Sequence, residues 1–419
     1  MTQTEKQKMM LTAPVEGLIC RMAVPTIISM LITALYNMAD TYFVGKLGSN
    51  AATGAVGVAL PLMAIIQATG FFFGHGSGNS ISRHLGAGDV EDAETLAVCG
   101  FAGAIGAGLI ICVLGQLFLE PLSLLLGSTE TILPYAKEYM RYILFAAPYM
   151  TAALVLNNQL RLQGNANFAM IGITSGAVLN VALDPLFIFT FDMGVAGAAA
   201  ATALSQLVSF VILLWALKRA GCVPLRFRYV RCMPSVIGQI FGGGLPSLVR
   251  QGLGSLSVMM LNRAAGPYGD AAIAAMSIVG RISQFAGSAV IGFGQGFQPV
   301  CGFNYGARKY DRMHRAFSFS VKVTTIVLLV LGAAGFAFAE PVVTLFRRSD
   351  PEVIRIGTET FRIQILTVWA WGFITLSNMY TQAIGYGIRS TILAAARQGL
   401  FLIPTLLVLP NVWGLHGLE

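Results

Sequence analysis

Charged side chains are scarce in this chain of 419 residues: Lys, Arg, Asp and Glu make up only 11% of it. Soluble domains carry about 25% charged residues, so too few polar side chains are present here to cover a water-facing surface. Hydrophobic residues make up 55% of the chain, and its mean hydropathy is +0.71. The composition therefore excludes an ordinary soluble domain and predicts an integral membrane protein.

Reactive cysteine and histidine patterns are also absent. The histidines are scattered, and no H-E-x-x-H or comparable catalytic motif occurs. No cysteines have C-x-x-C or metal-site spacing, and most lie in apolar stretches, where cysteine behaves as a small hydrophobe. We therefore expect no disulfide framework, no zinc site, no enzyme activity and no resident cofactor. The residues concerned are His75, His84, His314, His416, Cys20, Cys99, Cys112, Cys222, Cys232 and Cys301.

Apolar stretches long enough to cross a bilayer recur along the whole chain. A window of about 19 residues finds eleven of them, joined by short connectors that leave little room for a separate soluble domain. We expect membrane spans near 18–44, 52–81, 95–119, 136–160, 167–190, 194–217, 235–261, 271–301, 316–339, 353–380 and 388–410.

Basic residues predict the orientation of these spans in the plasma (inner) membrane. The opening MTQTEKQKMM lacks the apolar core of a cleaved signal, so we expect a cytoplasmic amino terminus. The net charge of +8 is then a topology signal and an affinity for anionic lipid, and it does not require nucleic acid. The cytoplasmic segments hold Lys6, Lys8, Arg83, Arg161, Lys218, Arg219, Arg226, Arg228, Arg231, Arg308, Lys309, Arg312, Arg315 and Arg389. The opposite loops hold little beyond Lys46, Arg263, Arg347 and Arg348.

The two halves of the chain repeat each other. An offset of 220 or 221 residues places Pro25 on Pro246 and Gly74-His75-Gly76 on Gly294-Gln295-Gly296. Further matches are glycines, prolines and boundary charges, which fix backbone shape and helix ends. A complete repeat has six spans, so both halves share one orientation. We expect an all-α integral membrane protein with two six-helix lobes related by a parallel repeat, and a cavity between them typical of alternating-access transporters.

The repeat also predicts the domain boundaries. The amino-terminal lobe covers 1–217, a basic cytoplasmic linker covers 218–234, and the carboxy-terminal lobe covers 235–419. By the same offset the sixth span, Val195 to Leu217, needs a partner that starts near Leu415, but the sequence ends at Glu419. Twelve helices are therefore expected, and we expect the last one to be missing here.

Two carboxylates stand out inside the spans, Asp40 and Asp184. A charge at the centre of a membrane helix costs about 2.5–3.5 kcal/mol, so each acid needs a proton, a cation or a water-filled cavity. Both lie a turn or two short of the outer ends of their helices. Tyr36 and Asn37 precede Asp40 by four and three residues, which places them on its helical face.

The second acid has polar neighbours and a proline directly behind it. Asn180 precedes Asp184 by four residues, and Thr202 lies at the same level on the next span. Pro185 leaves the carbonyl of Val181 without its helical donor, and in lipid such a carbonyl needs protein or cavity water. Hard cations prefer such oxygen ligands, so the cluster predicts a Na⁺ or proton site facing a wet chamber. The alternative is a structural, hydrogen-bonded role for each acid; their matched depth favours function.

Several motifs resemble those of the multidrug and toxic compound extrusion (MATE) family, in order and at matching spacing. They are ALYNMADTYFVGKLG (34–48), GSGNSISRHLGAGD (76–89), NVALDPLFIF (180–189) and FNYGARKYD (303–311). The resemblance covers essentially the whole chain apart from the expected last helix. It implies a secondary antiporter that expels small organic, often cationic, compounds in exchange for H⁺ or Na⁺. We expect it to act as a monomer in contact with membrane lipid.

The resemblance also implies positions for the site. The bend of the family's first helix falls on Pro25, and Pro185 is a second hinge candidate. The seventh, eighth and tenth spans hold no deep acid, so coupling is expected to rest on the amino-terminal lobe. The coupling site, and the possible Na⁺ ligands, fall on Asp40, Asn180, Asp184 and Thr202, with Tyr36 nearby.

The carboxy-terminal lobe places arginines inside its spans. For Arg281, near Gln284, we favour snorkelling to the outer interface. Arg250 lies deeper, and it either pairs with a carboxylate across the lobes or stabilises packing. The candidates for lining the cavity and contacting substrate are Tyr36, Asn37, Asn157, Arg250 and Gln251, with Asn158 a weaker one.

Other functions stay open at this point. A flippase for a lipid-linked saccharide or another amphiphile would need cations that bind phosphate, so Arg250 and Arg281 are the residues that discriminate it from drug efflux. A passive channel is harder to exclude, but the repeated lobes argue for rocking motions.

Overall fold

The computed structural model describes residues 2–265, 267, 270–346 and 350–413, and every regular element in this part of the chain is a helix. The predictions made for Arg347, Arg348, His416 and the region around Leu415 fall outside these residues. The first half contains α1 (Gln3–Thr12), α2 (Val15–Gly45), α3 (Asn50–Ala87), α4 (Val90–Leu117), α5 (Leu119–Leu125), α6 (Leu133–Leu162), α7 (Ala166–Pro185), the π-helix η1 (Leu186–Thr190) and α8 (Gly194–Arg219).

The second half follows a short connector that contains the 3₁₀-helix η2 (Phe227–Cys232). Its helices are α9 (Met233–Ala265), α10 (Asp270–Gly306), α11 (Tyr310–Ala337), α12 (Ala339–Phe346), α13 (Pro351–Ala383), α14 (Gly387–Ala395), the π-helix η4 (Ala396–Phe401) and α15 (Leu402–Trp413).

The predicted multi-pass membrane architecture is confirmed. In the described part of the chain, nine helices are long and apolar enough to cross a membrane, and a pair bent by 41° around η4 makes a tenth span if counted as one. The helix α13, with 33 residues, occupies the position of the remaining predicted span. Large apolar side chains face outward along these helices, as on α11, where Ile326 and Val330 are 61% and 63% exposed. Such a surface is compatible with lipid and not with water.

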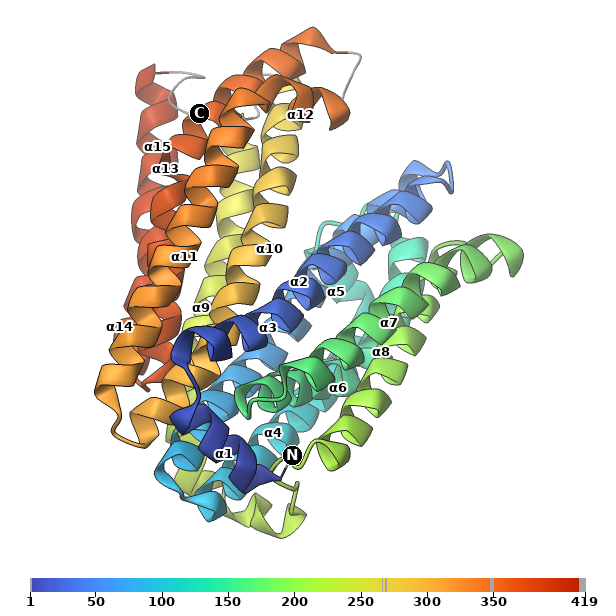
Figure 1. The fold of residues 1–419 in the computed structure, drawn as a ribbon. Coiled ribbons are helices and arrows are strands. Elements are labelled where there is room, and N and C mark those ends of the chain that lie inside the picture. The colour runs from blue at the N-terminus through green and yellow to red at the C-terminus, as the bar shows by residue number, and fades with distance from the viewer. Residues whose placement is uncertain (1, 266, 268–269, 347–349, 414–419) are drawn as a thin grey trace.

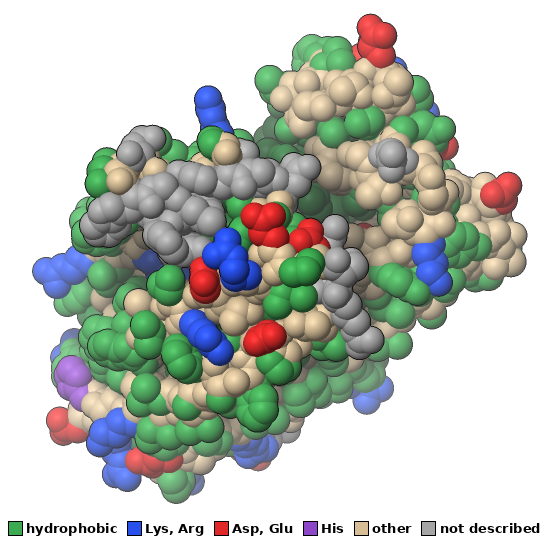
Figure 2. Space-filling model, turned by 90° about the horizontal axis from the view of Figure 1, so that it is seen from above, with side chains coloured by type: hydrophobic (Ala, Val, Ile, Leu, Met, Phe, Trp, Pro, Cys, Tyr) green, Lys and Arg blue, Asp and Glu red, His purple; other side chains and the backbone are tan. Residues whose placement is uncertain are grey.

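The helices form two lobes, α2 to α8 and α9 to α15, that meet at one end of the molecule and diverge at the other (Figure 1). The joined end also holds α1, and we call it the α1 end. Figure 2 looks onto the opposite end and shows the surface hollowed between the lobes.

Glycines permit the close contact of the lobes near the α1 end. A Cβ atom added at Gly86 of α3 would lie 2.8 Å from the carbonyl carbon of Phe303 in α10, and one added at Gly296 of α10 would lie 2.8 Å from the carbonyl carbon of Met22 in α2. No real Cβ atom tolerates such distances, so the backbones can approach this closely only because these positions are glycine.

A cluster of polar side chains, which we call the interlobe cluster, is buried where the lobes meet. It consists of His75, Arg161, Ser247, Gln295 and Gln382, each at most 2% exposed. The guanidinium of Arg161 donates to Oε1 of Gln295 in the other lobe, and Oγ of Ser247 lies 3.0 Å from Nδ1 of His75. Within the second lobe, Nε2 of Gln382 donates to Oγ of Ser247 at 2.8 Å.

The structure adds burial to one of the predicted basic residues. Arg161, which the sequence assigns to the cytoplasmic segments, is 1% exposed and makes its hydrogen bonds inside the protein. The arginine lies near the end of α6, where sequence alone cannot distinguish a loop charge from one that a second lobe covers.

Candidate functional site

The predicted site residues Asn180, Asp184 and Thr202 meet between α7 and α8. Nδ2 of Asn180 lies 3.3 Å from Oδ1 of Asp184 and 3.3 Å from Oγ1 of Thr202, and it donates to both. Asn180 and Asp184 share a face because they are one helical turn apart. Thr202 reaches the same level because α8 packs back along α7 after the turn that joins them. All three side chains are at most 3% exposed.

The other acid, Asp40, reaches this cluster from α2, which packs against α7. Asp40 is half-buried, and its carboxylate is close enough to Asp184 for the two charges to act on each other. Tyr36, one turn before Asp40, is within electrostatic reach of both acids, and its hydroxyl lies near the side chain of Gln206 of α8. The two aspartates therefore share one region of the first lobe, far from the α1 end.

Three oxygens at this site are buried without a hydrogen-bond partner among the described residues: Oδ1 of Asp40, Oδ1 of Asn180 and Oδ2 of Asp184. A buried acceptor without a donor costs about 1–3 kcal/mol, and more when it is charged. Two carboxylates near each other in a low dielectric repel as well. A proton or a small cation would relieve both costs, and carboxylate, amide and hydroxyl oxygens are suitable ligands for a hard cation.

Pro185 shapes the end of α7 that is distant from the α1 end. The α-helix ends at this proline, and the chain continues as the π-helix η1, so the wider turn follows directly after Asp184. Proline removes one backbone donor, and π-helical turns often occur at functional sites. In α2, by contrast, Pro25 lies inside a helix that runs unbroken from Val15 to Gly45.

The structure places the other candidates in different surroundings. Asn37, predicted on the face of Asp40, is exposed. Asn157 is buried and donates to the carbonyl of Ala169 at 3.0 Å, so it ties α6 to α7. Its repeat counterpart Asn378 donates to the carbonyl of Ser390 at 2.7 Å in the same way.

The two candidate arginines of the second lobe also have different surroundings. Arg250 donates to Oδ1 of Asn378 at 3.2 Å within its own lobe, and it has no carboxylate partner among the described residues, so in this conformation the packing interpretation fits and the cross-lobe ion pair is not formed there. Gln251 beside it is half-buried, whereas Arg281 is exposed, as a snorkelling side chain would be.

Sequence reasoning missed two residues near the acids. Gln206 follows Thr202 by one turn on α8, and that spacing could have identified it. Tyr139 of α6 is fully buried and within electrostatic reach of Asp40 and Asp184. No local pattern marks Tyr139, because its position depends on how α6 packs against the other helices of the lobe.

Known proteins match this chain along most of its length. The MatE family model matches the chain twice, at residues 25–186 and 246–407, with the offset that aligns the two halves of the sequence. The chain is 28% identical over 397 residues to the multidrug export protein MepA of Staphylococcus saprophyticus, covering 94% of this chain and 87% of that protein. It is 28% identical to MepA of Staphylococcus aureus over 406 residues, or 97% and 89% of the two chains.

Solved structures give the same result. A structure described as the outward-facing conformation of a multidrug resistance MATE family transporter superposes with a TM-score of 0.91, at 28% identity over 98% of this chain and 92% of that one. A crystal structure of MATE in complex with MaL6 gives a TM-score of 0.93 at the same identity and coverage. The chain therefore belongs to the MatE family, the multidrug and toxic compound extrusion family of membrane transporters.

Proposed function

We propose that this protein is a secondary multidrug efflux transporter that exchanges organic, mainly cationic compounds for H⁺ or Na⁺ by alternating access. The observation that carries the proposal is the set of unpaired oxygens on Asp40, Asn180 and Asp184. The relatives named multidrug export proteins support the choice of substrate class.

The shape of the molecule supports the direction of the cycle. The lobes are joined at the α1 end and parted at the other, and the acids lie in the part of the first lobe that is distant from the joint. We propose that the α1 end faces the cytoplasm, which makes this conformation outward-facing. A similar structure was described as outward-facing.

In the proposed cycle the coupling ion enters from outside and binds the acids, and the drug leaves. The lobes then part at the α1 end, and the ion is released to the cytoplasm. Ion and drug must prefer different conformations, since a ligand that binds both equally shifts nothing. The ion would act through Asp184, Asn180 and Thr202 on α7 and α8. In the described part of the chain, neither helix packs closely against a helix of the second lobe.

The test is uptake of a fluorescent organic cation, such as ethidium, into inside-out vesicles that contain the protein, with pH and Na⁺ gradients imposed separately. Uptake driven by one gradient and abolished when that gradient is collapsed would support antiport and identify the ion. Uptake that simply equilibrates the dye, with no response to either gradient, would instead indicate a passive pathway.

A flippase for a lipid-linked saccharide is the second candidate. Arg250 is half-buried in the second lobe and bonds only to a neutral amide among the hydrogen bonds of the described residues, which leaves its charge available to phosphate. Binding of a pyrophosphate lipid that is lost in Arg250→Gln would favour this function over drug efflux.

A further inference from the structure

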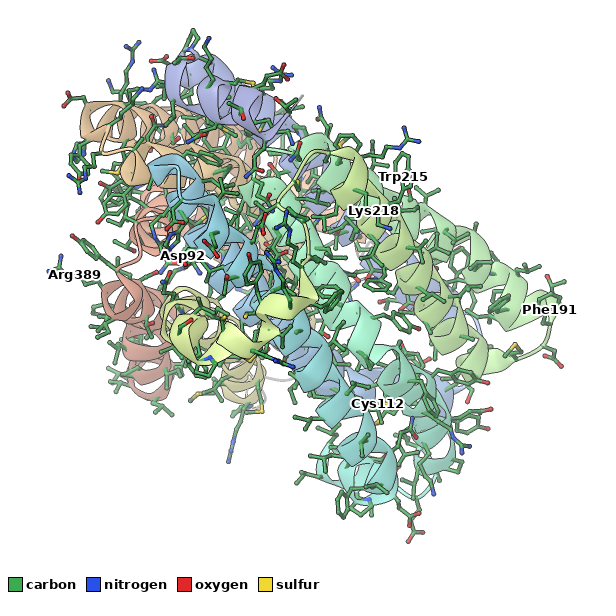
Figure 3. The ribbon with its side chains drawn as sticks, turned by 90° about the horizontal axis from the view of Figure 1, so that it is seen from below. Asp92, Cys112, Phe191, Trp215, Lys218 and Arg389 are labelled. Carbon is green, nitrogen blue, oxygen red and sulfur yellow. The ribbon has the colours of Figure 1, made fainter. Side chains whose placement is uncertain are left out.

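A small cavity with several polar side chains in its wall lies where α1 meets both lobes, far from the proposed coupling site. Its volume is about 90 Å³. It is lined by the first two turns of α1, by residues at the ends of α3, α4, α6 and α8, and by Phe303 of α10 in the second lobe. Figure 3 views the molecule from this end. The cavity has no role in the proposed transport cycle.

Lys6 supplies a buried cation at the cavity. Its side chain is only 5% exposed, and its ammonium group donates to the carbonyl oxygens of Ala220 and Gly221, directly after α8. An ammonium group has three donors, so one is left for a further partner. Burial lowers the pKa of Lys6 from its ordinary value, because desolvation disfavours the charged form. A bound anion would offset that desolvation.

Gln163 supplies a donor whose orientation is fixed. Its Oε1 accepts the backbone N–H of Val223 at 2.8 Å, which identifies the other end of the amide as Nε2. Gln163 is only 3% exposed. Its Nε2 atom is buried and has no hydrogen-bond partner among the described residues. The Nε2 atom of Gln3 in the cavity wall is buried and unpaired as well. Unsatisfied buried donors are costly, so they indicate a missing acceptor.

The start of α1 is the other part of the wall that can attract an anion. No Asp or Glu occurs among the described residues that line the cavity. The Thr2–Glu5 capping box occupies the N–H of Glu5, but no hydrogen bond of the described residues uses the N–H groups of Gln3 and Thr4, which carry the partial positive charge of the helix start. The helix α4 also begins at the cavity, with Val90, but its start is capped by Asp89 and carries two further acids, so it contributes no anion site.

From these contacts we propose that the cavity binds a phosphate-type oxyanion, held by Lys6, Gln163 and the first turn of α1. The volume suits a small oxyanion or the phosphate of a lipid headgroup, and the donors present would satisfy its oxygens. Inorganic phosphate and an anionic phospholipid share this chemistry.

Occupancy would strengthen the joint between the lobes. The other end of α1 is already bonded to the second lobe, since Nδ2 of Asn304 donates to the carbonyl of Met10 at 3.3 Å and Nη2 of Arg312 donates to the carbonyl of Ala13 at 2.6 Å. An anion between Lys6 and Gln163 would fasten the beginning of α1 to the first lobe. The bound state would therefore hold the α1 end closed.

The experiment measures the thermal unfolding midpoint of the full chain in two settings. In detergent, inorganic phosphate is titrated against chloride at matched ionic strength. In nanodiscs, phosphatidylglycerol is compared with phosphatidylcholine. The variants are Lys6→Gln, which removes the cation, and Gln163→Glu, which keeps the oxygen for Val223 but replaces the free donor with a carboxylate. Lys8→Gln, an exposed lysine on the same helix, is the matched control.

We expect both site variants to weaken binding by roughly tenfold or more, since each loses a charge-assisted bond, while Lys8→Gln binds like the parent chain. Stabilisation by inorganic phosphate identifies a soluble anion as ligand, and stabilisation only by phosphatidylglycerol identifies a lipid headgroup. If the parent chain responds to neither probe, or if both variants respond as it does, the site does not exist. These readouts need no transport, so they are independent of the proposed efflux function.

Discussion

His75 and Gln295 occupy equivalent positions in the two halves of the chain, and both contact the guanidinium group of Arg161. Nε2 of His75 lies 3.3 Å from Nη2 of the arginine, and Oε1 of Gln295 accepts from Nη1. The first lobe thus contributes the charged group and the second lobe a neutral acceptor. A buried charge depends strongly on such partners, so in the proposed transport cycle the interlobe cluster would have to break before the lobes part at the α1 end.

Removing this charge should loosen the α1 end. Arg161→Gln loses hydrogen bonds from a charged group that contribute about 1.5–3 kcal/mol each, so we expect the ratio of outward-facing to inward-facing molecules to fall by about tenfold or more. Spin labels at Glu130 and Glu352, placed in a cysteine-free background at the ends of the lobes distant from α1, would report the change as a shorter separation.

The opposite change is the matched control. Gln295→Glu places a carboxylate against Arg161, so it should populate the long separation more fully and slow turnover. Distances that stay the same in both variants would show that the cluster fills space without biasing the conformations.

Asp184→Asn should abolish coupled transport. The substitution is nearly isosteric and keeps an acceptor for Asn180, but it removes the charge that we propose binds the ion. We expect drug accumulation in ion-loaded vesicles to fall to background, while the protein remains folded. Asp192→Asn, at an exposed turn, is the control and should transport normally. Normal accumulation in the Asp184 variant would remove this residue from the mechanism.

Thr202→Val tests whether the hydroxyl is an ion ligand. Valine preserves the volume but cannot coordinate a cation. If Na⁺ is the coupling ion, we expect the apparent affinity of the protein for Na⁺ to fall roughly tenfold. The half-saturating ion concentration for dye efflux measures this. Ser205→Ala on the same helix removes a hydroxyl that bonds back to the carbonyl of Ala201. It should leave ion dependence unchanged, and an equal effect of both variants would contradict ligation by Thr202.

Gly86→Ala tests the close approach of the lobes. The added Cβ would lie 2.8 Å from the carbonyl carbon of Phe303, so backbone must shift, and we expect a loss of about 1–3 kcal/mol in stability. Gly106→Ala meets no atom within 4 Å and should be neutral or slightly stabilising in its helix. Thermal unfolding in detergent compares the two, and equal midpoints would show that the interface is more compliant than its geometry indicates.

Much of this architecture can be predicted from local sequence patterns. Apolar runs predict the spans because a segment inside lipid must be apolar and helical. The repeat of glycines and prolines predicts two lobes. The approach of Asn180, Asp184 and Thr202 also follows from local rules, since one helical turn joins the first two and a short connection between α7 and α8 sets the depth of the third.

Features that depend on contacts between distant segments of the chain could not be predicted from the sequence. Arg161 resembles a loop charge until Gln295 of the other lobe covers it. Tyr139 lies near the acids only because of the packing of the first lobe.

The glycines at Gly86 and Gly296 have a mechanical consequence. Where the backbones of the two lobes are in direct contact at these glycines, no interdigitated side chains have to separate before the lobes move apart. At these positions the lobes can therefore separate without moving interlocked side chains, while the polar bonds of the interlobe cluster and apolar contacts such as that between Phe72 and Phe241 hold them together. Substitutions far from any bound drug could in this way set how fast the pump turns over.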